Sequence, residues 1–233
     1  MTVRPILFSG PMVRALLDGR KSQTRRVMKP QPTNVANCDR IEWHTKSGWC
    51  EASEDQFARL IMEDLAHLLP YAVGDLLWVR EAWRVDARFD SYKPRELPRT
   101  AHPNLDYLAT AKPDDFGLAG KTRASFFMLR WASRLTLRVT EVRVQRLREI
   151  SEEDAKAEGA PFDTEACDHK RHTCDEIGCS GPGYRGGFAT LWDSLNAKRD
   201  GGAFSWASNP WVVAVSFEVI RANVNQVVEE SDG

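Results

Sequence analysis

The residues of this chain with the clearest chemical potential lie in the stretch DGRKSQTRRV, residues 18–27. The stretch surrounds the hydroxyl of Thr24 with four cations: Arg20, Lys21, Arg25 and Arg26. A threonine hydroxyl is a poor nucleophile until a base removes its proton. A lysine becomes such a base when its pKa falls, and both burial and neighbouring cations lower a lysine pKa. The stretch therefore predicts Thr24 as a nucleophile and Lys21 as its base, unless the two are only parts of an ordinary strand with a solvated basic edge.

The same cations support a second interpretation, in which they bind phosphate or carbonyl oxygens. Two other positions combine arginine with aromatic side chains, an arrangement on which unpaired bases stack. They are Trp78 and Trp83 around Arg80 and Glu81, and Trp131 with Arg130, Arg134 and Arg138. Glu81 is predicted either to orient Lys21 or Arg26 or to form half of a structural ion pair. The alternative for the tryptophans is a buried core beside arginines that reach the solvent.

A third group of residues has the chemistry of a metal site. The segment ACDHKRHTCDEIGCSG holds five candidate ligands, namely Cys167, His169, His172, Cys174 and Cys179. Tetrahedral zinc takes four nitrogen or sulfur ligands from closely spaced loops. We predict a zinc ion bound by Cys167, His169, Cys174 and Cys179, with His172 as the alternate ligand. Four protein ligands leave no position for water, so the zinc is expected to be structural. The alternative is a loop with free thiols, and no organic cofactor is expected.

Composition limits the possible partners. The chain has 233 residues with a formal net charge of −1, so nucleic-acid affinity must come from a local basic patch. No apolar run approaches the roughly 20 residues of a membrane span. The apolar stretch near the N-terminus is too short for a signal peptide. We therefore expect a cytoplasmic protein with no membrane partner, in which crowded cysteines favour metal binding over disulfides.

Hydrophobic periodicity predicts the elements that position these residues. Helices are expected over 11–19, 54–70, 151–159 and 188–196. Strands are expected over 4–10, 22–29, 74–85, 133–147 and 210–220. The apolar phase of the strand 133–147 slips after Glu141, which predicts a bulge or a sharp bend. Ser151 is the expected N-cap of the helix that follows, with acidic residues in its first turn.

This order of elements predicts an α+β fold, a small open mixed β-barrel with helices at its mouth. We expect a single domain over residues 1–233. Loop insertions are predicted at about 30–54, 86–123 and 160–187.

The stretch GRKSQTRR resembles the Gly-x-Lys-x-x-Glu-x-Arg signature of the ASCH domain, a PUA-like β-barrel. The matching positions are Gly19, Lys21, Thr24 and Arg26, and Thr24 stands where many members have glutamate. With threonine at this position, the chain is similar to the small bacterial N4-acetylcytidine amidohydrolases of the same superfamily, whose motif is Gly-Arg-Lys-Thr-x-Thr-x-Arg. Outside the insertions, most of the chain also resembles phage and prophage ASCH-domain proteins.

The resemblance implies an active site made of a lysine, a threonine three residues later and a distant glutamate. The matching residues are Lys21, Thr24 and Glu158, and they imply hydrolysis of an N4-acylated cytidine with Glu158 as proton donor to the leaving amine. One alternative is a PUA-like module that binds RNA or a modified base without catalysis; a second is a ribonuclease. The predicted binding residues are Arg20, Arg25, Arg26, Glu81, Trp83, Arg130, Trp131 and Arg134. The expected partner is a modified nucleoside or RNA.

Overall fold

The computed structural model of the protein describes residues 1–34, 39–46, 48–97, 105–111, 120–165, 167, 169 and 179–231. These residues form five α-helices and three β-sheets, which confirms the α+β class. None of the sheets formed by the described strands closes into a barrel.

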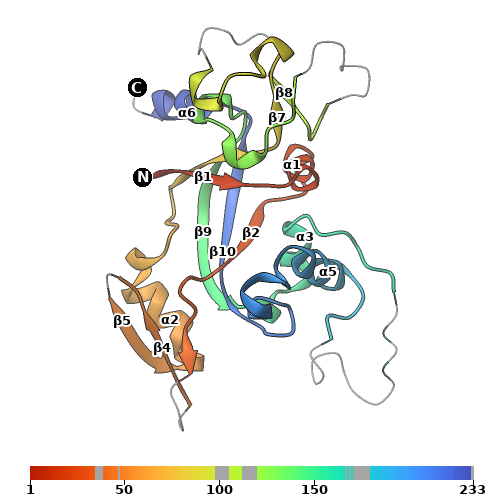
Figure 1. The fold of residues 1–233 in the computed structure, drawn as a ribbon. Coiled ribbons are helices and arrows are strands. Elements are labelled where there is room, and N and C mark those ends of the chain that lie inside the picture. Colours follow the sequence, from red (N-terminus) through yellow and green to blue (C-terminus); the bar gives the residue numbers. More distant parts are fainter. Residues whose placement is uncertain are drawn as a thin grey trace. The chain divides into compact units, whose positions relative to one another are not determined.

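The elements follow the chain in the order shown in Figure 1. They are β1 (Val3–Leu7), α1 (Gly10–Leu17), β2 (Gln23–Val27), β3 (Thr33–Asn34), β4 (Arg40–His44), β5 (Trp49–Ser53), α2 (Glu54–Asp64), β6 (Leu76–Arg80), β7 (Trp83–Arg84), β8 (Asp106–Tyr107), β9 (Thr136–Arg146), α3 (Glu152–Ala157), α5 (Tyr184–Asn196), β10 (Trp211–Ile220) and α6 (Val224–Ser231). The short 3₁₀ turns used below are η5 (Ser125–Phe127) and η6 (Arg130–Ala132).

The chain divides into two compact units, each described here by itself. Unit 1 comprises residues 1–19, 73–140 and 217–233, and unit 2 comprises residues 20–72 and 141–216. The boundary falls within the two longest strands, β9 and β10. Each predicted insertion falls within one unit: 86–123 in unit 1, and 30–54 and 160–187 in unit 2. The single domain over 1–233 stays a prediction.

The largest sheet has the strand order β1-β6-β9-β10-β2. Strand β1 pairs parallel with β6, whereas β6 pairs antiparallel with β9, and β10 with β2. In β9 the alternation of buried and exposed residues breaks at Thr140 and Glu141, which are both exposed. The predicted change of phase at Glu141 is therefore confirmed.

Two clusters of buried apolar residues stand out in the described part of unit 1. One contains Trp83, Met128 and Ala132, from β7 and from the turns around η5 and η6. The other packs Val224 and Val227 of α6 against Leu76 and Trp78 of β6. The predicted strand 74–85 is interrupted in this unit, because β6 ends at Arg80 and β7 begins at Trp83.

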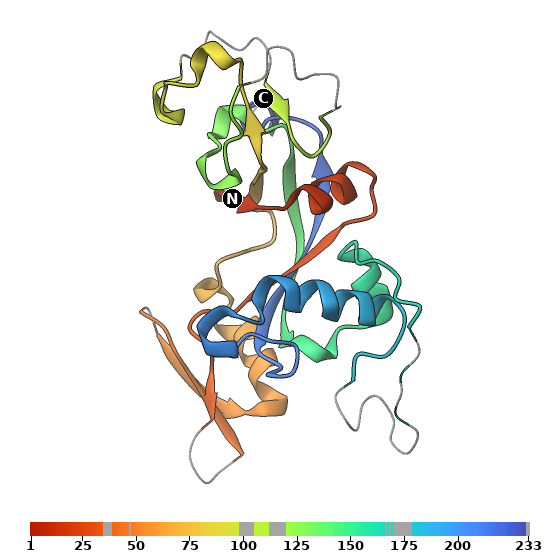
Figure 2. The same cartoon turned by 45° about the vertical axis from the view of Figure 1, so that its right-hand side comes forward.

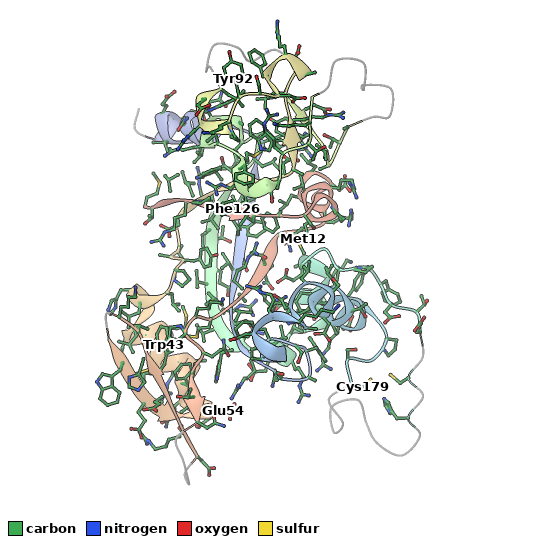
Figure 3. The ribbon with its side chains drawn as sticks, viewed as in Figure 1. Met12, Trp43, Glu54, Tyr92, Phe126 and Cys179 are labelled. Carbon is green, nitrogen blue, oxygen red and sulfur yellow. The ribbon has the colours of Figure 1, made fainter. Side chains whose placement is uncertain are left out.

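Part of unit 2 differs from the prediction. Residues 30–54 were expected to be loop, but much of this segment forms the antiparallel sheet β3-β4-β5. Residues of β4 and β5 alternate between buried and solvent-facing, the pattern of a half-buried hairpin, so the loop prediction missed an available signal. Trp43 of β4 packs edge-on against Phe57 of α2, with ring centroids 6.4 Å apart; Figure 3 labels Trp43 at this contact.

The helices of unit 2 pack around a second core. Helices α3 and α5 lie side by side, as Figure 2 shows. Ala155 of α3 and Phe188 and Trp192 of α5 share a cluster with Leu147 and Val212. Trp192 and Trp211 are both buried, which confirms that they belong to the core. Helix α5 starts at Tyr184, earlier than predicted, after Gly183 with φ 98°.

Candidate active site

The candidate site is built where the residues before β2 meet the end of α3. Helix α3 begins after its N-cap Ser151, whose hydroxyl accepts a hydrogen bond from the Asp154 amide, and ends at Ala157. The Ser22 amide donates to the Ala157 oxygen at 2.8 Å, and Lys21 forms an antiparallel bridge with Glu158. This backbone pairing holds the two segments in register.

Lys21 and Glu158 contact each other directly in this bridge. The Nζ atom of Lys21 lies 2.7 Å from the backbone oxygen of Glu158 and 2.7 Å from its carboxylate Oε2. Lys21 is 1% exposed and Glu158 is 4% exposed. The two side chains therefore meet in one buried hydrogen bond, at a distance typical of a charge-assisted contact.

A second set of charged side chains surrounds the pair. Arg25 donates from Nη1 to Glu158 Oε1 at 3.2 Å and from Nη2 to Asp154 Oδ2 at 2.7 Å. Gln23 donates to Asp154 Oδ1 at 3.2 Å, and Arg143 donates to Asp154 Oδ2 at 3.0 Å. Asp154 therefore joins three donors, and Arg25 links it to the carboxylate that bonds Lys21.

Thr24 lies on the other face of β2. Side chains alternate along a strand, so Gln23 and Arg25 share one face while Thr24 and Arg26 share the opposite one. Thr24 is 4% exposed and pairs in register with Val215 of β10. Among the residues that the structure describes, no hydrogen bond joins the Thr24 hydroxyl to another group. The Thr24 hydroxyl is thus not part of the hydrogen-bond network around Asp154.

Burial dominates the electrostatics of Lys21. Burial lowers the Lys21 pKa below its usual 10.5; Glu158 raises it, whereas Arg26 and Arg25 lower it further. The predicted effect of neighbouring cations is therefore present for Arg25 and Arg26. Burial also lowers the Arg26 pKa, and the charge of Glu158 opposes that shift. Arg26 thus acts on both Lys21 and Glu158, although alternation puts it on the face of Thr24.

The surroundings of Asp154 favour its charged form, whereas those of Lys21 favour its neutral form. Burial by itself would raise the Asp154 pKa, but the charge and hydrogen bond of Arg25, and then the charge of Arg143, lower it below its usual 3.8. The carboxylate is therefore held in its charged form, as an anchor for Arg25 rather than as a proton donor.

Asp154 and Gln23 were not singled out as site residues from the sequence. Asp154 was assigned only to the first turn of its helix, where acidic residues complement the dipole. Asp154 and Glu158 are four residues apart at the end of one helix, a spacing that places side chains on one face. Gln23 and Arg25 share a strand face by alternation. Together these two patterns could have indicated the network.

Most of the other predicted binding residues belong to unit 1. Glu81 is 1% exposed and accepts two hydrogen bonds from Arg134, at 2.8 and 2.9 Å. Glu81 therefore forms half of a structural ion pair, which is one of the two roles that the sequence predicted for it. The Arg134 guanidinium also lies 4.0 Å from the ring centre of Tyr107.

Trp83 belongs to the core of unit 1. It is 0% exposed, Trp131 meets it edge-on at 6.3 Å, and the Arg123 guanidinium lies 5.6 Å from its ring. A base could stack on Trp83 only if these neighbours moved. Trp131 is half-buried, Arg130 is exposed, and Arg20 in unit 2 is also exposed.

Three of the predicted metal ligands lie together in unit 2. The ligand atoms of Cys167, His169 and Cys179 all lie within 4.8 Å of one another, and the two Sγ atoms are 3.5 Å apart. Two thiolates on one tetrahedral zinc are about 3.8 Å apart, from Zn–S bonds of about 2.3 Å. The described donors therefore fit a zinc ion in both chemistry and spacing. Cys174 and His172 lie outside the described residues; Figure 3 labels Cys179.

Comparison of the chain with models of known families, with curated proteins and with solved structures gave no match. Within the described part of the chain, no helix combines the length and the apolarity needed to cross a membrane.

Proposed function

We propose that this protein is a PUA-like ASCH amidohydrolase that removes an acyl group from the N4 atom of a modified cytidine. Lys21 is the base, Thr24 the nucleophile and Glu158 the proton donor. The observation that carries the proposal is the buried contact of Lys21 with Glu158, in which the Lys21 pKa is lowered. The resemblance of GRKSQTRR to the amidohydrolase signature supplies the substrate class.

The first step acylates the enzyme. The reaction starts from the form of the pair in which Lys21 is a neutral amine, which burial favours, and the proton of the pair lies on Glu158. Lys21 takes the proton of the Thr24 hydroxyl, and the Thr24 oxygen bonds to the acyl carbon. The C–N bond breaks, and the leaving N4 amine receives the proton of Glu158.

The second step restores the enzyme. Lys21 is now an ammonium and Glu158 a carboxylate. Glu158 takes a proton from water, whose oxygen attacks the acyl carbon. The bond to Thr24 breaks, and Lys21 returns its proton to the threonine oxygen. The products are the free carboxylic acid and the cytidine amine, and both side chains regain their starting protonation states.

Two features of the site support this assignment. Arg25 and Lys21 share the carboxylate of Glu158, and the charges of Arg26 and Arg25 add to burial in lowering the Lys21 pKa. These effects favour the neutral amine that a base needs. The Thr24 hydroxyl has no competing hydrogen bond in the described chain, so it is available for a substrate.

The test is hydrolysis of N4-acetylcytidine by wild type and by Lys21→Ala, Thr24→Ala and Thr24→Ser. We expect wild type to release cytidine and acetate, and the two alanine variants to be about 10²- to 10⁴-fold slower. Thr24→Ser keeps a hydroxyl and retains part of the activity, with the acyl group found on residue 24 by mass spectrometry. Lys198→Ala, at an exposed lysine of the same unit, is the matched control.

Two results would overturn the proposal: a wild type that releases no cytidine, or a Thr24→Ala variant that is as fast as wild type. Binding of modified nucleotides without turnover would instead indicate a non-catalytic PUA-like module. Scission of an RNA strand would indicate a ribonuclease.

The zinc site completes the proposed description. Cys167, His169 and Cys179 hold a structural zinc ion, with Cys174 as the fourth predicted ligand. Zinc would stabilise the segment that leads into α5, the helix that packs against α3. It takes no part in the hydrolysis described above.

A further inference from the structure

Two adjacent aromatic rings are exposed on unit 1. Phe126 is 65% exposed and Phe127 is 54% exposed, both in the short turn η5. Their ring centroids are 5.5 Å apart and their planes are nearly perpendicular, at 80°. Figure 3 labels Phe126 on this turn. Large apolar side chains are usually buried, so two exposed neighbours indicate a contact surface.

The turn is held firmly on both sides. Arg123, before the turn, exchanges two backbone hydrogen bonds with Trp83, at 2.8 and 3.1 Å. Met128, directly after it, is 1% exposed in the core that contains Trp83. Arg80 donates to the Phe126 oxygen at 3.2 Å. The two rings are therefore presented by an anchored turn rather than by a free loop.

The sequence around the rings is basic, although Arg123, Arg134 and Arg138 lie near the carboxylates of Asp90, Glu81 and Glu218. Residues 120–140 contain five cations and no carboxylate, in a chain with a net charge of −1. The five are Lys121, Arg123, Arg130, Arg134 and Arg138. Lys121 and Arg130 form no ion pair with any residue that the structure describes, and neither does Arg80.

Other exposed aromatic residues lie in a different environment. Trp49 is 62% exposed and is followed by Glu51, while Phe162 is 60% exposed and is followed by Asp163 and Glu165. The rings of η5 are thus distinguished by the absence of nearby acidic residues in sequence. A partner that suits them has flat apolar faces and negative charge.

We propose that Phe126 and Phe127 form a docking surface for unpaired nucleic acid. Bases stack on the two rings, and Arg80, Lys121 and Arg130 bind the phosphates that link them. Perpendicular rings cannot both stack within one continuous run of parallel bases, so each ring takes a base from a bent strand. The surface goes beyond the proposed hydrolysis, because it uses none of the residues Lys21, Thr24 or Glu158.

The experiment measures the affinity of the full-length protein for a fluorescent single-stranded RNA of about 12 nucleotides. Phe126→Ala and Phe127→Ala should each weaken binding by about five- to a hundred-fold. Phe126→Trp should retain it, whereas Phe126→Leu, which stays apolar, should lose it. Lys121→Ala and Arg130→Ala should each flatten the salt dependence, by about 0.7 in its logarithmic slope. Trp49→Ala is the matched control and should bind like wild type.

Three results would overturn the proposal. The first is a wild type that does not bind the RNA at low salt. The second is a Phe126→Leu variant that binds as tightly as wild type, which means apolar contact without stacking. The third is a self-association of the protein that the Phe126→Ala/Phe127→Ala variant abolishes while RNA binding stays unchanged. Hydrolysis of free N4-acetylcytidine is measured on Phe126→Ala and Phe127→Ala and should not change, so each proposal can fail independently of the other.

Discussion

The Nζ atom of Lys21 lies 2.7 Å from both the backbone oxygen and the carboxylate of Glu158, a residue 137 positions further along the chain. The side-chain contact is fixed by the backbone bridge between the same two residues. Because Arg25 holds the other carboxylate oxygen, the carboxylate cannot rotate away from Lys21 without breaking a second ion pair. The candidate base and the candidate acid are therefore preorganised in contact.

The rate of hydrolysis should fall as pH rises through the Lys21 pKa, because the Lys21–Glu158 pair then loses the proton that the leaving amine receives. The Lys21 pKa is lowered from 10.5 by burial, against the opposing effect of Glu158, so this fall lies below pH 10.5. Between the lowered pKa and 10.5, the unfolded chain binds more protons at this residue than the folded chain. The free energy of unfolding therefore rises with pH in that window. Urea titrations of wild type and Lys21→Met over this range check the prediction, since the variant should lack this rise.

Acid should destabilise the protein partly through Asp154. Its folded-state pKa lies below the usual 3.8, because Arg25 and Arg143 outweigh the effect of burial. Stability from this group is present above pH 3.8 and is lost as pH falls through the lowered pKa. Asp154→Asn should be less stable at neutral pH and should lose less stability on acidification. If the free energies of unfolding of variant and wild type fell equally as the pH dropped below 3.8, Asp154 would not be a charged anchor.

Removing the carboxylate of Glu158 should destabilise unit 2. Glu158→Gln leaves Lys21 and Arg25 buried without their shared anion, at a cost of about 3–5 kcal/mol in the free energy of unfolding. The double variant Lys21→Met/Glu158→Gln should recover part of that loss, because it removes one of the two buried cations. Chemical denaturation of the single and double variants measures both effects. A Glu158→Gln variant as stable as wild type would show that Lys21 is already neutral without its partner.

The Glu81–Arg134 pair should stabilise unit 1 more than an exposed pair does. Glu81 is nearly fully buried, so Arg134→Ala leaves an unpaired carboxylate and should cost about 2–3 kcal/mol. Arg138→Ala is the matched control on the neighbouring strand. Arg138 is 45% exposed and 3.9 Å from Glu218, and its removal should cost less than about 1 kcal/mol. Equal losses from the two variants would contradict a structural role for Glu81.

Chelation should destabilise the protein if zinc binds Cys167, His169 and Cys179. The purified protein should contain one zinc ion per chain, and Cys179→Ser should contain less. A ligand that binds only the folded state raises the melting temperature by about 5–15 °C when its concentration is a hundred to a thousand times its dissociation constant. Chelation should lower the melting temperature by the same amount. Metal analysis and thermal melts with and without chelator measure the two effects. Cys50→Ser is the control for metal content, because Cys50 lies in β5, outside the cluster.

Hydrophobic periodicity in the sequence was sufficient to predict much of the fold. Periodicity located α1, α2, α3, β9 and β10 near their observed positions, and the phase slip at Glu141 is present in β9. It failed at β4 and β5, whose alternation was a local signal left unused, and it joined β6 and β7 into one strand. The second error arises because pairing with a neighbouring strand, rather than local preference, decides whether a short segment is extended.

By itself, the sequence determined the α+β class, the Lys21–Thr24 spacing and a cysteine-rich segment with metal-binding chemistry. The resemblance added Glu158, whose catalytic role stays a prediction. Only the tertiary structure decided that Asp154 anchors Arg25, that Trp83 is buried and that Phe126 is exposed. Such contacts join segments that are distant in the chain, and their formation depends on strand register and packing. A local pattern reports which residues are apolar, but the fold decides which of them are covered.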